Sequence, residues 1–151
     1  MNILEGLLFI NNTDVWLQFG AFLSEDNANE HRNYSELMKP AAVKPYVSVA
    51  FREDDGEELP ANLLTRSEAR DVTLQFAIIA DNAVQFKQRY TAFMAFLKSG
   101  WLDVEVPELD EMFRFYFVSC SGYEQLSPPL PPQGGVAASF SIKFREPGPF
   151  V

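Results

Sequence analysis

Few residues of this chain have the types and spacing that catalysis or metal binding requires. His31 is the only histidine and Cys120 the only cysteine. A nucleophilic pair needs the thiol beside the imidazole, and nothing in the sequence brings these two positions together. A zinc site would need several carboxylates besides them. Because Cys120 ends an alternating apolar run that starts at Phe113, we interpret it as a small buried hydrophobic residue.

An acidic run invites a calcium interpretation. It consists of Glu53, Asp54, Asp55, Gly56, Glu57 and Glu58. An EF-hand loop with Gly56 at its sixth position needs an acidic first residue and a glutamate at the last. Those two positions hold Phe51 and Asn62. We therefore interpret the run as a solvated hairpin tip after an expected strand at Tyr46–Phe51, with an irregular cation site as the alternative.

Further carboxylates lie close together in the second half of the chain. Asp103 and Glu105 alternate with apolar residues in one expected strand, and Asp110 and Glu111 lie at the following turn. A glycosidase needs two carboxylates that face each other across a cleft. We interpret these side chains instead as the solvated face of a strand. The sequence has no glycine-rich phosphate loop, nucleophile elbow or zinc-binding helix motif, so we expect neither an enzyme nor a cofactor.

Charge and composition narrow the class of partner. The 151 residues include 12 basic and 21 acidic side chains, giving a net charge of −9, and 47% are hydrophobic. This balance is typical of one globular domain over residues 1–151. Phosphate backbones and anionic membranes attract basic surfaces, so we expect neither specific nucleic-acid binding nor membrane association. No apolar run approaches the ~20 residues of a membrane span, and one cysteine fits a reducing cytoplasm.

Alternating apolar residues predict a mainly β fold. Period-two runs are typical of strands with one buried face. They occur at Val15–Leu23, Val47–Phe51, Val72–Ile78, Leu102–Val106, Phe113–Val118 and Ala138–Arg145. Ala83–Lys98 instead has helical spacing, and Tyr34–Met38 predicts one helical turn. Asn82 and Gln85 form a capping box, and Gly100 is the expected left-handed stop. We expect an antiparallel β-sandwich or partly closed barrel, an α+β fold with one flanking helix.

Aromatic and proline residues outside the expected core indicate a surface for other subunits. Trp16 and Phe22 alternate with the apolar face of their run, and Tyr116 alternates with the phenylalanines of its strand. The connections Ser24–Lys44 and Ser127–Gly135 are polar or proline-rich, and a stiff loop loses little entropy on docking. The interface candidates are Trp16, Phe22, Tyr34, Leu37, Tyr116, Pro128, Pro129, Leu130, Pro131 and Pro132.

The order of several short motifs resembles tail proteins of long-tailed bacteriophages and prophages. These motifs are Asn11–Trp16, Phe19–Leu23, Lys44–Tyr46, Arg70–Phe76, the helix Ala83–Lys98, Gly100–Val104, Phe113–Phe117 and Phe144–Pro147. Together they cover almost the whole chain. The likeness is greatest to the N-terminal domain of distal-tail proteins, within the wider tail-tube fold.

The resemblance implies a virion tail component, made in the host bacterial cytoplasm, that assembles into a ring where the tube joins the baseplate. Such rings are usually hexamers of the chain itself, bind other tail proteins and leave a channel for DNA. Longer members have a further C-terminal domain, for which this chain has no room after Val151, so we expect no receptor contact. An acidic channel would let DNA slide without binding.

These expectations assign roles to particular segments. We expect the loops Ser24–Lys44 and Ser127–Gly135 to contact neighbouring copies. The acidic residues Glu53–Glu58 would face the channel or solvent. The motif order does not distinguish a distal-tail role from that of a tube or terminator subunit.

Two other hypotheses stay open. One is a monomeric β-barrel in which the helix closes a phenylalanine-lined cavity around a small apolar ligand. The other, which the sequence favours least, is a hydrolase built on paired carboxylates. The first predicts a monomer with a sizeable apolar pocket, whereas a tail component needs no small-molecule substrate.

Overall fold

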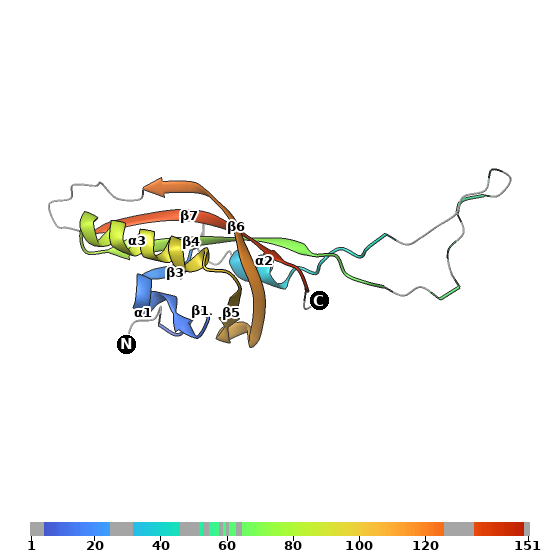
Figure 1. Ribbon diagram of the computed structural model, residues 1–151, viewed down its shortest axis with the longest axis horizontal. Coiled ribbons are helices and arrows are strands. Elements are labelled where there is room, and N and C mark those ends of the chain that lie inside the picture. Colours follow the sequence, from blue (N-terminus) through green and yellow to red (C-terminus); the bar gives the residue numbers. More distant parts are fainter. Residues whose placement is uncertain are drawn as a thin grey trace.

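The computed structural model describes residues 5–24, 32–45, 52, 55–57, 59, 61–62, 65–125 and 135–149. Within them, a seven-stranded antiparallel sheet curls into a half-barrel, in the order β2-β1-β5-β6-β7-β4-β3 (Figure 1). The strands are β1 (Phe9–Ile10), β2 (Thr13–Asp14), β3 (Ala21–Leu23), β4 (Arg70–Ala80), β5 (Leu102–Val106), β6 (Glu111–Gln125) and β7 (Val136–Glu146). The mainly β, antiparallel architecture predicted from the sequence is confirmed.

The longest ladder joins β4 to β7. Its register runs from Arg70 opposite Glu146 to Ala80 opposite Val136 without a shift. Strand β6 pairs with the other side of β7, and its register shifts after Phe117 and again after Ser121. Four of the predicted strand runs fall inside β4, β5, β6 and β7, and the expected strand at Tyr46–Phe51 lies outside the described residues.

Phenylalanine rings fill the space inside the curled sheet. Phe76 of β4 lies in edge contact with Phe93 and in stacked contact with Phe140, at centroid distances of 5.5 and 6.3 Å. Phe115 stacks on Phe144 at 5.5 Å. Rings in these geometries add to the stability from burial alone. Other fully buried members of the same cluster are Ile10, Leu37, Val72, Leu74, Ile78, Leu97, Leu102, Val106, Ala138 and Ile142.

The main helix, α3 (Ala83–Leu97), packs on the inner face of β4 and β7. Asn82 caps its first turn, because its Oδ1 accepts from the Gln85 N–H at 2.8 Å. The Gln85 side chain accepts in return from the Asp81 N–H, one residue before the expected partner. The helix is confirmed, but Lys98 is its C-cap, and Gly100 has a φ of +130°, outside the left-handed helical region predicted for it.

The prediction of one strand over Val15–Leu23 is wrong. The segment forms a short helix, α1 (Val15–Phe19), followed by β3. Asp14 caps the helix by accepting from the Trp16 N–H at 3.0 Å, and Gly20 ends it with a φ of +65°. Within this helix Leu17 is 65% exposed, although alternation assigned it to the buried face. The capping signals therefore prevail over the alternating pattern.

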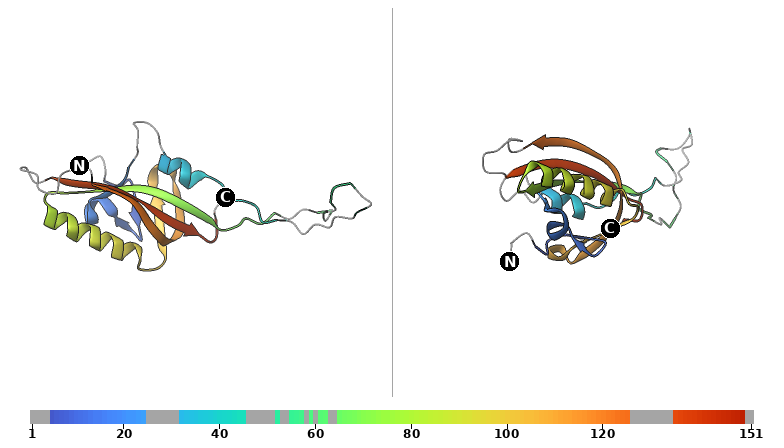
Figure 2. Two further views of the ribbon diagram at one scale, coloured as in Figure 1. Left: turned by 90° about the horizontal axis from the view of Figure 1, so that it is seen from above. Right: turned by 60° about the vertical axis from the view of Figure 1, so that its left-hand side comes forward.

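A second helix, α2 (Arg32–Met38), confirms the helical turn expected at Tyr34–Met38. After it, the described residues between 39 and 69 form an arm that projects beyond the sheet. In the arm Val43 and Ser67 form an antiparallel bridge, and the Lys44 N–H donates to the Arg66 carbonyl at 2.8 Å. The arm and α3 lie at opposite ends of the long axis of the molecule (Figures 1 and 2).

Candidate functional site

The carboxylates considered for a hydrolase, Asp103, Glu105, Asp110 and Glu111, lie on the β5–β6 hairpin. Asp103 lies 3.8 Å from Arg114 across the hairpin, so a cation partly balances it. Glu105, Asp110 and Glu111 border a shallow hollow of about 150 Å³ beside the turn η1 (Pro107–Leu109). Among the described residues, no group of three or more His, Cys, Asp or Glu side chains is arranged to hold a metal ion.

Cys120 lies half-buried on β6 and packs against the core, as its apolar context predicted, although the strand continues beyond it to Gln125. Burial raises the pKa of its thiol, and the hydrogen bond from Tyr90 and the charge of Lys98 offset this rise only in part. Burial, followed by the interaction with Cys120, raises the pKa of Tyr90 to about 12. Both groups are therefore protonated at neutral pH, and the thiol is not an activated nucleophile. His31 lies outside the described residues.

An open groove runs between α3 and the second half of β6. It measures about 610 Å³ and is lined by Tyr90, Thr91, Met94, Ala95, Lys98, Phe117 and Cys120. The Lys98 ammonium lies 5.6 Å from the centre of the Phe117 ring. The core phenylalanines themselves are packed in the interior, with Phe93 fully buried, so this groove lies on the surface of the half-barrel.

The exposed side of α3 continues this surface. A second open depression of about 500 Å³ is bordered by Val84, Lys87, Gln88, Thr91, Ala92 and Ala95. Thr91 and Ala95 border both depressions, so the two lie on either side of the same small side chains. We call the residues of these two depressions that belong to α3, together with Lys98, the α3 face.

Trp16 and Phe22, both predicted interface candidates, contact each other. Trp16 belongs to α1 and Phe22 to β3, and their rings meet edge to face at 6.0 Å. Both side chains are half-buried in the protomer. They lie near the outer end of the strand order, where β3 is the last strand of the sheet.

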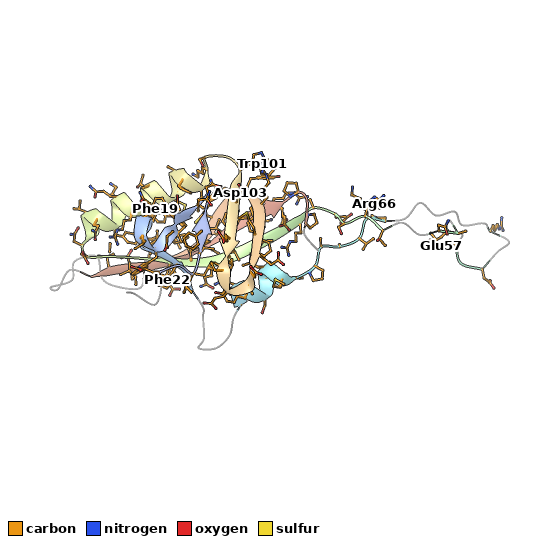
Figure 3. All side chains as sticks on the ribbon, turned by 90° about the horizontal axis from the view of Figure 1, so that it is seen from below. Phe19, Phe22, Glu57, Arg66, Trp101 and Asp103 are labelled. Atoms are coloured by element: carbon orange, nitrogen blue, oxygen red, sulfur yellow. The ribbon has the colours of Figure 1, made fainter. Side chains whose placement is uncertain are left out.

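Tyr116 belongs to an aromatic cluster that the sequence did not predict. Its ring meets that of Trp101 edge to face at 5.9 Å, and the Arg114 guanidinium lies 4.5 Å from the Trp101 ring centre. The side chain of Asn11 fixes the backbone beside Trp101, since it donates to the Trp101 carbonyl and accepts from the Asp103 N–H. Figure 3 shows Trp101 and Asp103 together beside β5. Trp101 is 51% exposed.

Helix α2 holds the other two aromatic or apolar candidates of the first connection. Tyr34 is half-buried and packs against the core. Leu37 is fully buried within its own chain, so the structure places this interface candidate in the core. Next to Tyr34, the Asn33 side-chain amide accepts from the Gln75 N–H at 2.7 Å and donates to the Gln75 carbonyl at 3.3 Å. The Asn33 side chain thereby connects α2 to the edge of β4 through two hydrogen bonds.

A buried ion pair at the base of the arm was also absent from the sequence predictions. Arg70 and Glu146 lie opposite each other at the end of the β4–β7 ladder and are both almost fully buried. No motif distinguishes these residues from other charged residues at strand ends. Only the register of the ladder, which the sequence does not fix to a single residue, would have brought them together.

The acidic and proline-rich segments are described only in part. Asp55, Gly56 and Glu57 are exposed, and Figure 3 shows Glu57 far from the sheet, beyond Arg66. The candidates outside the described residues are Glu53, Asp54, Glu58, Pro128, Pro129, Leu130, Pro131 and Pro132.

No described helix has the length and apolarity needed to cross a membrane.

A comparison with solved structures finds a similar fold in a phage tail hub protein. No family model and no curated protein sequence matches the chain. Its structure is similar, with a TM-score of 0.60, to that of SPP1 Dit (gp 19.1), described as a paradigm of the hub adsorption apparatus in phages that infect Gram-positive bacteria. Identity is 8%, and the match covers 95% of this chain and 50% of that one. The predicted resemblance to distal-tail proteins is confirmed at the level of the fold.

Proposed function

We propose that the chain is a structural component of a bacteriophage or prophage tail. In this proposal its copies form a ring, with six as the expected number, where the tail tube meets the baseplate, and DNA passes through the ring. The observation that carries the proposal is the fold match to a phage hub protein over 95% of this chain. Its place is the virion tail, after synthesis in the host cytoplasm.

The shape of the protomer supports assembly through extended contacts. The arm projects from one end of the sheet, and a surface of this kind adds contact area without disturbing the core (Figure 2). We propose that Ser24–Lys44, which includes α2 and the first part of the arm, and Ser127–Gly135 contact neighbouring subunits. Of the aromatic interface candidates, Trp16, Phe22, Tyr34 and Tyr116 lie among the described residues, and each is half-buried rather than fully buried.

The negative net charge of the chain restricts which contacts can hold a ring together. Each copy carries a net charge of −9, so neighbouring copies repel unless their contacts bury apolar surface or place cations locally. The same acidity suits a channel through which DNA slides, because few cations are available to neutralise phosphates. The polar face of β4 and β7 carries Asp71, Lys143 and Arg145 as a small ion-pair cluster.

The first experiment measures the mass of the purified protein. We expect multi-angle light scattering to give a multiple of the 17.1 kDa protomer and negative-stain electron microscopy to show closed rings. Antibody labelling of intact virions should then place the protein at the tail tip. A stable monomer that co-purifies with a small apolar molecule would support the alternative, a ligand-binding β-barrel, and contradict the ring.

A further inference from the structure

The charge of α3 differs from that of the rest of the chain. Between Asn82 and Gly100 the sequence contains three basic residues, Lys87, Arg89 and Lys98, and no acidic residue. All other positions together hold nine basic and 21 acidic residues. The helix is therefore a local cationic element in an acidic protein, and its field favours an acidic partner.

The shape of the α3 face also suits the docking of another chain. Thr91 and Ala95 present small side chains between the two depressions, and Ala92 borders the second, so another chain can approach the helix closely. Val84 is 70% exposed at one end of this surface. No carboxylate is among the described residues that line either depression. Lys87 and Lys98 border the face, whereas Arg89 is turned away from it and donates to the Ile79 carbonyl at 2.7 Å.

The acidic counterpart lies at the far end of the same molecule. Asp55 and Glu57 are exposed in the outer part of the arm. Figure 1 shows α3 at one end of the long axis and the arm extending from the other end. The two surfaces of one copy therefore do not meet each other. Two complementary surfaces at opposite ends favour head-to-tail contacts, which close into a ring when the rotation between copies permits it.

We propose that the α3 face of one copy receives the arm of the next copy at Asp55 and Glu57. This inference rests on the proposed self-assembly and names the surfaces that carry it. Lys87 and Lys98 interact with the carboxylates, and the apolar and small residues between them contact the backbone of the arm. The opposite charges reduce the repulsion between copies of an acidic chain and fix which end of one copy meets which end of the next.

Charge reversal tests the pairing. We expect Lys87→Glu with Lys98→Glu to weaken self-association at least about tenfold in light scattering across a concentration series. In the wild type, added salt should weaken the attraction between these lysines and the carboxylates by screening. Adding Asp55→Lys with Glu57→Lys to that variant should restore association. The matched control, Lys143→Glu with Arg145→Glu, makes the same change in charge on the exposed face of β7 and should leave association within about twofold of the wild type. The inference is overturned if the control variant loses as much self-association as Lys87→Glu with Lys98→Glu. It is also overturned if adding Asp55→Lys with Glu57→Lys does not restore association.

Cross-linking separates this inference from the proposed function. In a Cys120→Ser background, Glu57→Cys with Thr91→Cys should give a ladder of disulfide-linked copies on mild oxidation. Replacing Thr91→Cys by Lys143→Cys provides the control and should give no ladder. Rings that form without a ladder overturn the α3 contact and leave the ring proposal intact. A protein that is monomeric at all concentrations and salt conditions overturns both.

Discussion

Arg70 and Glu146 form a buried ion pair where the arm leaves the sheet. Nε of Arg70 lies 2.6 Å from Oε1 of Glu146, and neither side chain is more than 8% exposed. The remaining guanidinium nitrogens donate to the carbonyls of Leu37 and Lys39, at the end of α2 and the start of the arm. One arginine therefore connects α2, the first residues of the arm and the strands β4 and β7.

Removing the charge of Glu146 should destabilise the fold. Glu146→Gln removes the carboxylate that pairs with the buried Arg70 guanidinium, and breaking a buried pair in this way costs about 3–5 kcal/mol. We expect the free energy of unfolding, measured in urea, to fall by about 3 kcal/mol, because the amide oxygen still accepts one hydrogen bond.

The exposed pair on the neighbouring rung provides the control. Arg145 lies 2.8 Å from Asp71, and both side chains are 41% exposed. Exposed pairs contribute at most about 1 kcal/mol, so Arg145→Gln should have a small effect. Equal losses for Glu146→Gln and Arg145→Gln would contradict the importance assigned to burial.

Gly20 should not tolerate a side chain. Its φ is +65°, and a Cβ at this position would lie 2.7 Å from the Ile79 carbonyl oxygen and 2.6 Å from Nη1 of Arg89. The left-handed conformation alone costs an alanine roughly 1–2 kcal/mol, and the collision adds to that cost. We expect Gly20→Ala to lower the melting temperature clearly in calorimetry. Gly135→Ala, where a Cβ would meet nothing within 4 Å, should leave it nearly unchanged.

The failure at Val15–Leu23 shows where period-two patterns mislead. Asp14 and Gly20 are visible in the sequence as a helix cap and a helix stop, yet the five residues between them are too few to show a helical period. The longer runs in β4 and β7 were predicted correctly because eleven residues show the alternation clearly. At Val15–Phe19 the caps at both ends therefore decide the structure against the alternation.

The candidate surfaces could be predicted only in part. Trp16, Phe22 and Tyr116 were predicted as aromatics outside the core, and all three are half-buried. Trp16 and Phe22 contact each other, and Tyr116 contacts Trp101. The sequence could not show that Leu37 points into the core, because one turn of helix gives no reliable inward face. The lack of acidic residues in α3 was visible in the sequence, but its meaning required the position of the arm.

The partly buried phenol of Tyr90 predicts a loss of stability at alkaline pH. Burial raises the pKa of Tyr90 to about 12, from an ordinary value of 10.0, so the folded state favours the neutral phenol. This contribution is fully present below pH 10 and is lost as the pH rises toward 12. We expect urea unfolding between pH 8 and 11 to show falling stability above pH 10, with a shallower fall for Tyr90→Phe. Identical slopes for the two proteins would contradict the assignment.

Asn33 protects an open edge of the sheet, and its removal should both destabilise the protein and promote aggregation. Its side chain accepts from the Gln75 N–H and donates to the carbonyls of Ser24 and Gln75 in a site where Asn33 is only 3% exposed. Asn33→Ala leaves these backbone groups without that partner, at a cost of about 1–3 kcal/mol for a buried group. An unpaired strand edge is also a template for another strand. We therefore expect lower stability in urea together with faster thioflavin-positive aggregation, whereas Ser35→Ala, on the exposed side of the same helix, should change neither measurement.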